Sequence, residues 1–121
     1  MLEIKQWLKE GTGLPVANTA FINKVTLPFI VFLEDIETQG SDLNNDLVER
    51  TFTVELYSST ISKINEIKIE KLLNEKSIKF KKSRTWLDDE HCFETMYDFS
   101  FLERIDENDN RQKWVKKNTF G

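Results

Sequence analysis

The pattern of apolar and polar residues first predicts a short N-terminal helix. Within the first ten residues, apolar side chains recur at helical spacing, at Leu2, Ile4, Trp7 and Leu8. The glycines at positions 11 and 13 then supply a stop, because glycine readily ends a helix. Residues 16–21, which follow Pro15, are expected to form an extended or irregular connection.

A second helix is expected from about residue 62 to residue 76, after several serine and threonine N-cap candidates at 58–62. Its apolar positions are Ile61, Ile64, Ile67, Ile69, Leu72 and Leu73. At about 100° per residue these positions cover a wide arc, so we expect the helix to be covered on two sides. The sheet would provide one cover, and the N-terminal helix or another subunit would provide the other.

Two central strands are expected, joined by a long loop. Residues 29–33 are apolar or β-branched and follow Pro28, which is typical of a well-buried strand. In the segment 48–57, the residues that share one face at the strand period are Val48, Arg50, Phe52, Val54 and Leu56. The connection over residues 34–46 is polar and acidic, and long loops often carry function.

Two further strands complete the pattern. Ile78 and Phe80 alternate with Lys79 and Lys81, as in an edge strand whose lysines face water. Trp86 is expected in the turn region that follows. One face of the last strand is expected to hold Phe93, Thr95, Tyr97, Phe99 and Phe101.

The order helix, strand, strand, helix, strand, strand predicts an α+β fold. Neighbouring strands joined by hairpins give an antiparallel sheet of about four strands with two helices on one face. Residues 1–104 are expected to form this single domain. Residues 105–121 are polar, and we expect a C-terminal tail that docks on a neighbouring subunit through its few apolar residues.

The composition is globular and excludes several classes of protein. Of the 121 residues, 39% are hydrophobic and 31% are charged. The single cysteine, Cys92, excludes an internal disulfide and fits a reducing compartment. No apolar run approaches the roughly 18 residues of a membrane span, and no signal-peptide pattern is found. We therefore expect a cytoplasmic location and no membrane partner.

The charged residues are segregated along the chain. Residues 63–84 hold eight basic and three acidic side chains, whereas residues 88–109 hold nine acidic side chains opposed only by Arg104. The segment 111–117 is basic again. Such a pattern forms either ordinary solvated faces or one positive and one negative flank suited to head-to-tail association. The net charge of −4 argues against nucleic acid as the main partner.

No residue pattern typical of catalysis or metal binding is found. His91 is the only histidine and adjoins the only thiol, Cys92, so on a strand the two would point to opposite faces. We expect a buried thiol and a surface imidazole. The segments 42–46 and 106–110 match the first ligand positions of an EF-hand loop, but both lack its glycine and its last glutamate. We expect no enzyme activity, no cofactor and no metal.

A basic cluster at 79–84 leaves one alternative open. Its four cations lie near Phe80 and Trp86, a combination that can bind single-stranded nucleic acid. An edge strand guarded by lysines explains the same residues, and we favour it. A small nucleic-acid-binding or regulatory domain is therefore an alternative function, and it predicts salt-sensitive binding.

A series of short motifs resembles small proteins of phages and prophages of Gram-positive bacteria. The series begins with Leu-Pro-Val-Ala-Asn-Thr-Ala-Phe at 14–21, Leu-Pro-Phe-Ile-Val-Phe at 27–32, Gly-Ser-Asp-Leu-Asn-Asn at 40–45 and Val-Glu-Leu-Tyr-Ser at 54–58. It ends with Trp86, Glu94 and Tyr97-Asp98-Phe99. Together the motifs cover about residues 2–103 and are similar to the tail-terminator and head–tail joining proteins of long-tailed phages.

The resemblance implies an α+β subunit without catalytic residues or cofactors. Such subunits assemble as a ring, usually a hexamer, on the end of the tail tube, stop its polymerisation and present a surface to the head connector. The partners would be copies of the chain itself, the tail tube protein and the head connector or stopper protein, with DNA only passing through the lumen. The protein would be assembled in the bacterial cytoplasm and reside in the virion. A head-side connector or stopper is the alternative within this class.

Two groups of residues are expected to make the contacts of such a ring, which needs two different patches on each subunit. The acidic loop, with Glu37, Asp42 and Asp46, should face the tail tube or the lumen, where like charge would keep DNA from adhering. The subunit interface should include the basic residues of the edge strand and two aromatic residues of the tail: Lys79, Lys81, Lys82, Arg84, Trp114 and Phe120.

Overall fold

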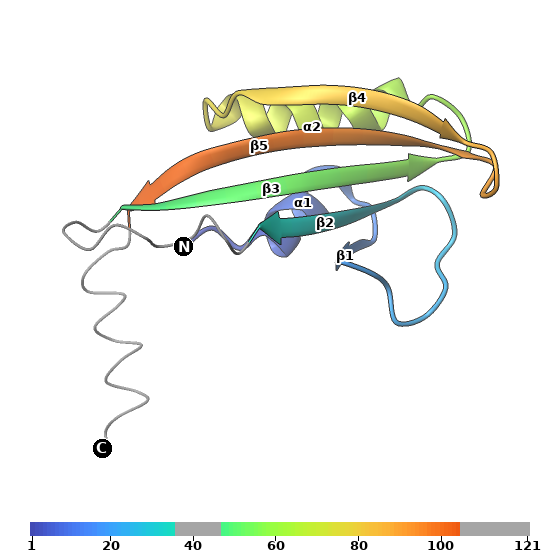
Figure 1. Ribbon diagram of the computed structural model, residues 1–121, viewed down its shortest axis with the longest axis horizontal. Helices are drawn as coiled ribbons and strands as arrows, with labels where there is room; N and C mark the ends of the chain where they lie inside the picture. Colours follow the sequence, from blue (N-terminus) through green and yellow to red (C-terminus); the bar gives the residue numbers. More distant parts are fainter. Residues whose placement is uncertain (36–46, 105–121) are drawn as a thin grey trace, which may run out of the picture.

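The computed structural model describes residues 1–35 and 47–104, which form a five-stranded sheet with two helices against one face (Figure 1). In chain order the elements are α1 (Ile4–Thr12), β1 (Val16–Asn18), β2 (Phe29–Asp35), β3 (Leu47–Ser58), α2 (Lys63–Glu75), β4 (Phe80–Leu87) and β5 (Cys92–Arg104). The strand order is β1-β2-β3-β5-β4, so the two longest strands lie side by side in the middle. The predicted α+β class and the two helices are confirmed.

The sheet is mixed rather than purely antiparallel, because a fifth strand joins one edge. β1 runs parallel to β2, with Val16 paired with Ile30 and Asn18 paired with Phe32, whereas the other neighbouring strands are antiparallel. The sequence predicted only an extended or irregular connection here. Three residues are too few to show a period of two, and the burial of Val16 and Ala17 against the sheet is what distinguishes them from a loop.

β4 extends further than its pattern indicated and includes Trp86, whose Nε1 donates to Asp88 Oδ1 of the following turn at 3.3 Å, in keeping with a residue that anchors this turn. Trp86 lies in this strand opposite Phe93 of β5, and the two rings meet edge to face with their centroids 4.9 Å apart. The turn follows at residues 88–91. β4 forms the outer edge of the sheet as predicted, and both Lys79 and Lys81 are exposed.

The core lies between the sheet and the two helices. The residues of β3 that were predicted to share one face are all buried: Val48, Arg50, Phe52, Val54 and Leu56. From the helices, Ile4 and Leu8 of α1 and Ile69 and Leu73 of α2 join the same cluster. Removal of this apolar area from water is the main force that holds the helices on the sheet.

The glycines of α1 end the helix and let it approach α2. Gly13 adopts a left-handed conformation, with φ of 74°, and its N–H donates to the carbonyl oxygen of Lys9, so it caps the helix. Gly11 lies against Leu72 of α2, and a Cβ atom at this position would collide with the leucine side chain. The two helices therefore pack closely on one face of the sheet.

α2 is covered by the sheet and by α1, whose Gly11 lies against Leu72, as predicted, but one set of apolar residues at its start and on its outer side stays exposed. Ile69 and Leu73 are buried, but Ile61, Ile64 and Ile67 are 44%, 72% and 60% exposed. These three isoleucines, called the α2 stripe below, form an apolar surface on the outside of the molecule.

Arg50 is a charged residue on the buried face of β3, and it closes one end of the core. Its guanidinium donates to Glu34 on β2 at 3.1 Å, to Glu103 on β5 at 3.0 Å and to the carbonyl oxygen of Leu2 at 2.8 Å. It also lies over the ring of Phe52, 4.9 Å from the centroid. Arg50 therefore ties the N-terminal segment to three neighbouring strands.

The substitution Arg50→Met is expected to lower the free energy of unfolding by about 3 kcal/mol, because it leaves two largely buried carboxylates without their cation. Methionine keeps an apolar stem over the Phe52 ring, so the loss reports the ionic contacts rather than the packing. Chemical denaturation at pH 7 measures the change, with the exposed Arg104→Met on β5 as the matched control. A loss below about 1 kcal/mol, the range of surface ion pairs, would contradict this role.

Candidate functional site

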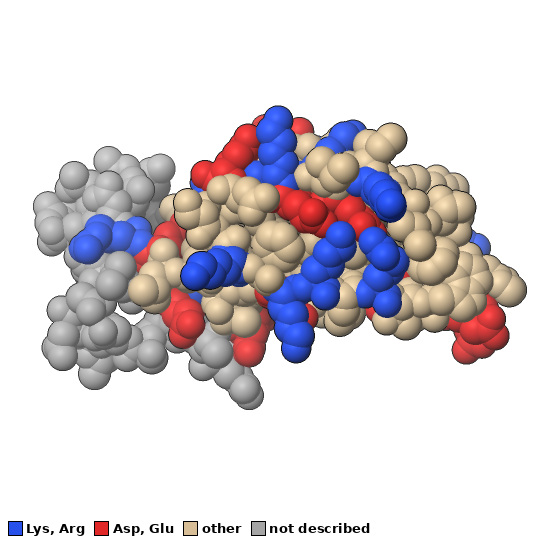
Figure 2. Space-filling model, turned by 90° about the horizontal axis from the view of Figure 1, so that it is seen from above, with Lys and Arg blue, Asp and Glu red and all other residues tan. Residues whose placement is uncertain are grey.

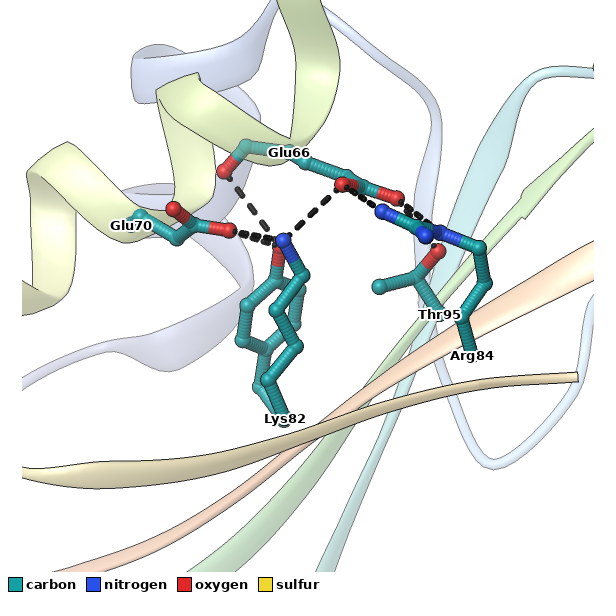
Figure 3. A network of polar contacts seen from close by, with 6 residues as sticks. Glu66, Glu70, Lys82, Arg84 and Thr95 are labelled. Carbon is teal, nitrogen blue, oxygen red and sulfur yellow. Dashed lines mark hydrogen bonds and ion pairs between the residues drawn. The ribbon is translucent and has the colours of Figure 1, made fainter. Parts of the chain in front are cut away.

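Two of the four predicted interface cations are paired with carboxylates of their own subunit. Lys82 and Arg84 lie on the face of β4 that meets α2, where both contact the carboxylate of Glu66 (Figure 3). Arg84 donates to Glu66 through Nε and Nη2, at 2.9 and 2.6 Å, in a bidentate arrangement. Lys82 Nζ lies 2.9 Å from Glu66 Oε1 and 2.7 Å from Glu70 Oε2. This network fastens α2 to the edge strand.

Glu66 is the centre of the network, and only 2% of it is exposed. Its Oε2 also accepts a hydrogen bond from the hydroxyl of Thr95 at 2.8 Å. Burial alone would raise the pKa of this carboxyl, but the hydrogen bonds from Arg84, Lys82 and Thr95 lower its pKa to about 2. Glu66 is therefore ionised at neutral pH, and its charge is matched within the subunit.

Tyr97 on β5 supports the same network. Its hydroxyl donates to Glu70 Oε2 at 2.8 Å, and its ring lies 5.9 Å from Lys82 Nζ. Burial, followed by the hydrogen bond to Glu70, raises the pKa of Tyr97, so the phenol stays protonated. Across the described ranges, no buried polar side-chain atom lacks a hydrogen-bond partner. The buried polar atoms of the network therefore all have hydrogen-bond partners, and the network holds α2 against β4.

The structure thus divides the predicted basic surface into two parts. Lys79 and Lys81 are exposed, whereas Lys82 and Arg84 are paired within the subunit. Figure 2 looks onto the molecule from above, and there basic and acidic side chains lie side by side rather than in one basic patch. The other predicted contact residues lie outside the described residues, and their roles stay predictions: Glu37, Asp42, Asp46, Trp114 and Phe120.

The sheet face away from the helices, called the outer sheet face below, carries a group of carboxylates. Glu55 on β3 and Glu94 and Asp98 on β5 lie on it, because they alternate with the buried positions of their strands. The hydroxyl of Tyr57 lies between two of them, 2.8 Å from Glu55 Oε1 and 2.7 Å from Glu94 Oε2. None of the ion pairs found within residues 1–35 and 47–104 includes these three carboxylates.

This arrangement holds more negative charge than it can satisfy internally. Tyr57 carries a single proton and can donate to one of its two carboxylate neighbours at a time. Desolvation raises the pKa of Glu55, and the charges of Glu94 and Asp98 raise it further, against the hydrogen bond from Tyr57, which lowers it. Desolvation and the hydrogen bonds to the two glutamates raise the pKa of Tyr57. The outer sheet face is therefore a place where an external cation would be favourable.

The substitution Glu55→Gln is expected to increase the free energy of unfolding at pH 7 by about 0.5 kcal/mol, the scale of a like-charge contact between strands. Because the folded-state pKa of Glu55 is raised above its unfolded value, the wild-type chain loses stability as the pH rises through the folded pKa. The gain should therefore disappear at about pH 4. Thermal melts at pH 4 and pH 7 measure it, with the exposed Glu49→Gln on the same strand as the control. A variant less stable than wild type at pH 7 would contradict the repulsion.

A pocket of about 620 Å³ opens between the outer sheet face and the connection from β1 to β2. Its apolar lining includes Phe21, Val25, Leu27, Phe29 and Val31, and Glu55 and Tyr57 contribute polar atoms. Cys92 also lines the pocket, but it is buried, and burial raises the pKa of its thiol. His91 is exposed on the adjacent turn. The predicted buried thiol and surface imidazole are confirmed.

In the part of the chain that the structure describes, no group of three or more His, Cys, Asp or Glu side chains could hold a metal ion. The outer carboxylates are spread over two strands beside Tyr57, whose pKa is raised. The two surfaces that distinguish this molecule are the α2 stripe and the outer sheet face.

The motifs that carry the phage resemblance lie mainly on the sheet. They supply β1, most of β2, the end of β3 and the middle of β5. In comparisons with known proteins, neither a protein-family model nor a curated protein matched this chain. Neither α1 nor α2 is long and apolar enough to cross a membrane.

Proposed function

We propose that the chain is a structural protein of a phage or prophage, a tail terminator whose copies form a ring on the end of the tail tube. The ring stops polymerisation of the tube and joins the tail to the head, so the protein resides at this junction of the virion. Its partners are further copies of itself, the tail tube protein and the head connector or stopper protein. DNA only passes through the lumen.

The observation that carries the assembly part of the proposal is the α2 stripe. Ile64 and Ile67 lie one helical turn apart and are both at least 60% exposed. Clustered apolar side chains on a surface, bordered by polar residues, are typical of a site that binds another protein. If the subunit works only when it is assembled, these apolar side chains are covered by a neighbouring subunit, and this explains why the helix face is apolar.

The phage part of the proposal rests on the motif series. Its members fall on all five strands, so the resemblance concerns the sheet that organises the fold. A head-side connector or stopper shares the same supporting observations, because it also forms a ring. The motifs do not separate the two, and a neighbouring gene for the major tail protein would favour the tail terminator.

The nucleic-acid alternative has lost part of its support. Lys82 and Arg84, half of the basic cluster, are already neutralised by carboxylates of α2. Affinity for single strands depends on cations that are free to replace counterions. Lys79 and Lys81 alone are a weak basis for such a function.

The function is tested by polymerising the tail tube protein encoded beside this chain, with and without the purified full-length protein. We expect shorter tubes of more uniform length that carry the protein at one end, as measured by negative-stain electron microscopy. The variant Ile64→Glu with Ile67→Glu is the matched control, because it should leave the subunit folded and the tubes uncapped. An unchanged length distribution with no protein at the tube ends would contradict the proposal.

A further inference from the structure

The outer sheet face has the character of a docking surface. Its apolar side chains include Phe29, Leu33 and Met96, and Phe29 stacks on Tyr57 with their ring centroids 5.1 Å apart. Leu33 is 37% exposed, although Ile30 and Phe32 of the same strand are buried in the core. Both described helices lie on the opposite face of the sheet (Figure 1). The connection from β1 to β2 covers part of the outer sheet face, where the rings of Phe21 and Phe29 meet edge to face, so the part available to a partner lies around Leu33 and Met96.

The charge of this face is mainly negative, with Lys81 of β4, which is paired in register with Asp98, as a cation at its edge. Glu94 is paired in register with Tyr57, and Asp98 with Thr53, so the two carboxylates lie on either side of Met96 along the outward face of β5. Thr53 donates to Asp98 Oδ1 at 2.6 Å, which fixes that carboxylate without neutralising it. A helix that supplies apolar side chains and cations would match the surface.

The α2 stripe has this complementary character. Lys63 and Lys71 lie beside Ile64 and Ile67 along the outside of α2, and both lysines are exposed. Neither takes part in any ion pair found within the described ranges. This differs from Lys82, the cation on the inner side, which is held by two carboxylates.

We propose that the α2 stripe of one subunit docks on the outer sheet face of the next subunit. The isoleucines contact the apolar side chains of that face, and Lys63 and Lys71 contact its carboxylates. The occupant is a second copy of this chain, because the chain's own helix supplies both the apolar spacing and the opposite charge. The inference rests on the ring proposed above, since it names the two surfaces that meet in it.

The positions of the two surfaces determine what kind of assembly they make. The α2 stripe points away from the sheet, because Ile69 and Leu73 face the core, and the outer sheet face lies on the other side of the molecule. A contact between two different patches is heterologous, and its repetition gives a closed ring or a filament. A two-fold dimer would need the same patch on both subunits.

Two full-length variants test the contact by exchanging its charges. Lys63→Glu with Lys71→Glu makes the surroundings of the α2 stripe acidic, and Glu94→Lys with Asp98→Lys makes the outer sheet face basic. Each variant alone is expected to need at least a tenfold higher concentration for half assembly, because like charges then meet. The matched control is Lys5→Glu with Lys9→Glu on α1, which changes the same amount of charge elsewhere and should assemble like wild type.

The decisive sample is an equal mixture of the two variants. In an alternating ring every contact again joins opposite charges, so we expect assembly near the wild-type concentration. Native mass spectrometry should then find even numbers of subunits, half from each variant. If one variant is unfolded alone, the chain that carries all four substitutions replaces the mixture and is expected to assemble.

The outcomes separate this contact from the proposed function. Wild-type rings together with folded variants that fail to assemble in the mixture would overturn the contact and leave the proposed function standing. A wild-type chain that forms no ring, either alone or on tail tubes, would overturn both. Thermal melts of each variant establish that it is folded.

Discussion

Replacing Ile64 and Ile67 together with glutamate is expected to abolish self-assembly and leave the folded subunit intact. Both side chains are mostly exposed in the single subunit, so the free energy of unfolding should change by no more than about 0.5 kcal/mol. In an assembled ring the same side chains are buried, and each buried isoleucine contributes about 1.5–3 kcal/mol. The loss corresponds to at least a hundredfold rise in the concentration needed for assembly, since about 1.4 kcal/mol is tenfold.

Analytical ultracentrifugation across a concentration series measures this effect, and chemical denaturation of the same samples measures the stability of the subunit. The matched control is Ile22→Glu, because Ile22 is fully exposed but lies in the connection between β1 and β2, away from α2. It should assemble like wild type. An Ile64→Glu, Ile67→Glu variant that still assembles at the wild-type concentration would remove the α2 stripe from the interface.

The substitution Glu66→Gln is expected to lower the free energy of unfolding at pH 7 by about 3 kcal/mol, the largest loss for any single polar side chain of the fold together with that of Arg50. Glutamine keeps the size and one acceptor for Thr95 but cannot match the charges of Arg84 and Lys82. Both cations are about a third exposed, so water partly solvates them when Glu66 loses its charge, and this reduces the loss of stability. α2 should loosen from the edge strand.

The pH dependence of this effect has a definite sign. The pKa of Glu66 falls from 4.5 to about 2 on folding, so its contribution is fully present above the unfolded value and is lost as the pH falls through the folded one. The difference between wild type and Glu66→Gln should therefore be constant near neutral pH and shrink between about pH 4.5 and pH 2. Equal stability of the two proteins at pH 7 would contradict the network.

The matched control for this experiment is Glu70→Gln, on the same helix one turn later. Glu70 forms an ion pair with Lys82 and accepts a hydrogen bond from the hydroxyl of Tyr97, but its side chain is 26% exposed. Solvent screens such a pair, so the expected loss is about 1 kcal/mol. A larger loss for Glu70→Gln than for Glu66→Gln would show that burial does not determine which of the two carboxylates contributes more to stability.

Periodicity was sufficient to predict the elements that are long enough to show it. The alternation of β3, the helical spacing of α1 and α2, and the lysines of the edge strand all correspond to elements of the structure. β1 was missed because three residues carry no period, and the end of β4 was not predicted because a large aromatic side chain such as Trp86 fits a turn or an edge strand equally well. Pairing with Phe93 settles its place in β4.

The interaction surfaces were harder to predict, because they depend on register. Glu55, Glu94 and Asp98 are each visible as polar residues in alternating strands, but only the pairing of β3 with β5 brings them together. Glu66 carried a usable signal: it is a carboxylate one turn before Ile69 on the buried side of a helix, where a charge needs a partner. Lys82 and Arg84, two residues apart on one strand, were the available cations, and this pairing is why they do not form an open basic patch.

The proposed assembly is tested most directly by the native mass of the purified full-length chain across a concentration series, with negative-stain imaging of any large species. We expect the monomer of 14.3 kDa to give way to a closed ring of about six subunits, without a stable dimer on the way. A stable dimer as the end point at high concentration would require contact between identical patches, and it would contradict a ring built from two different surfaces.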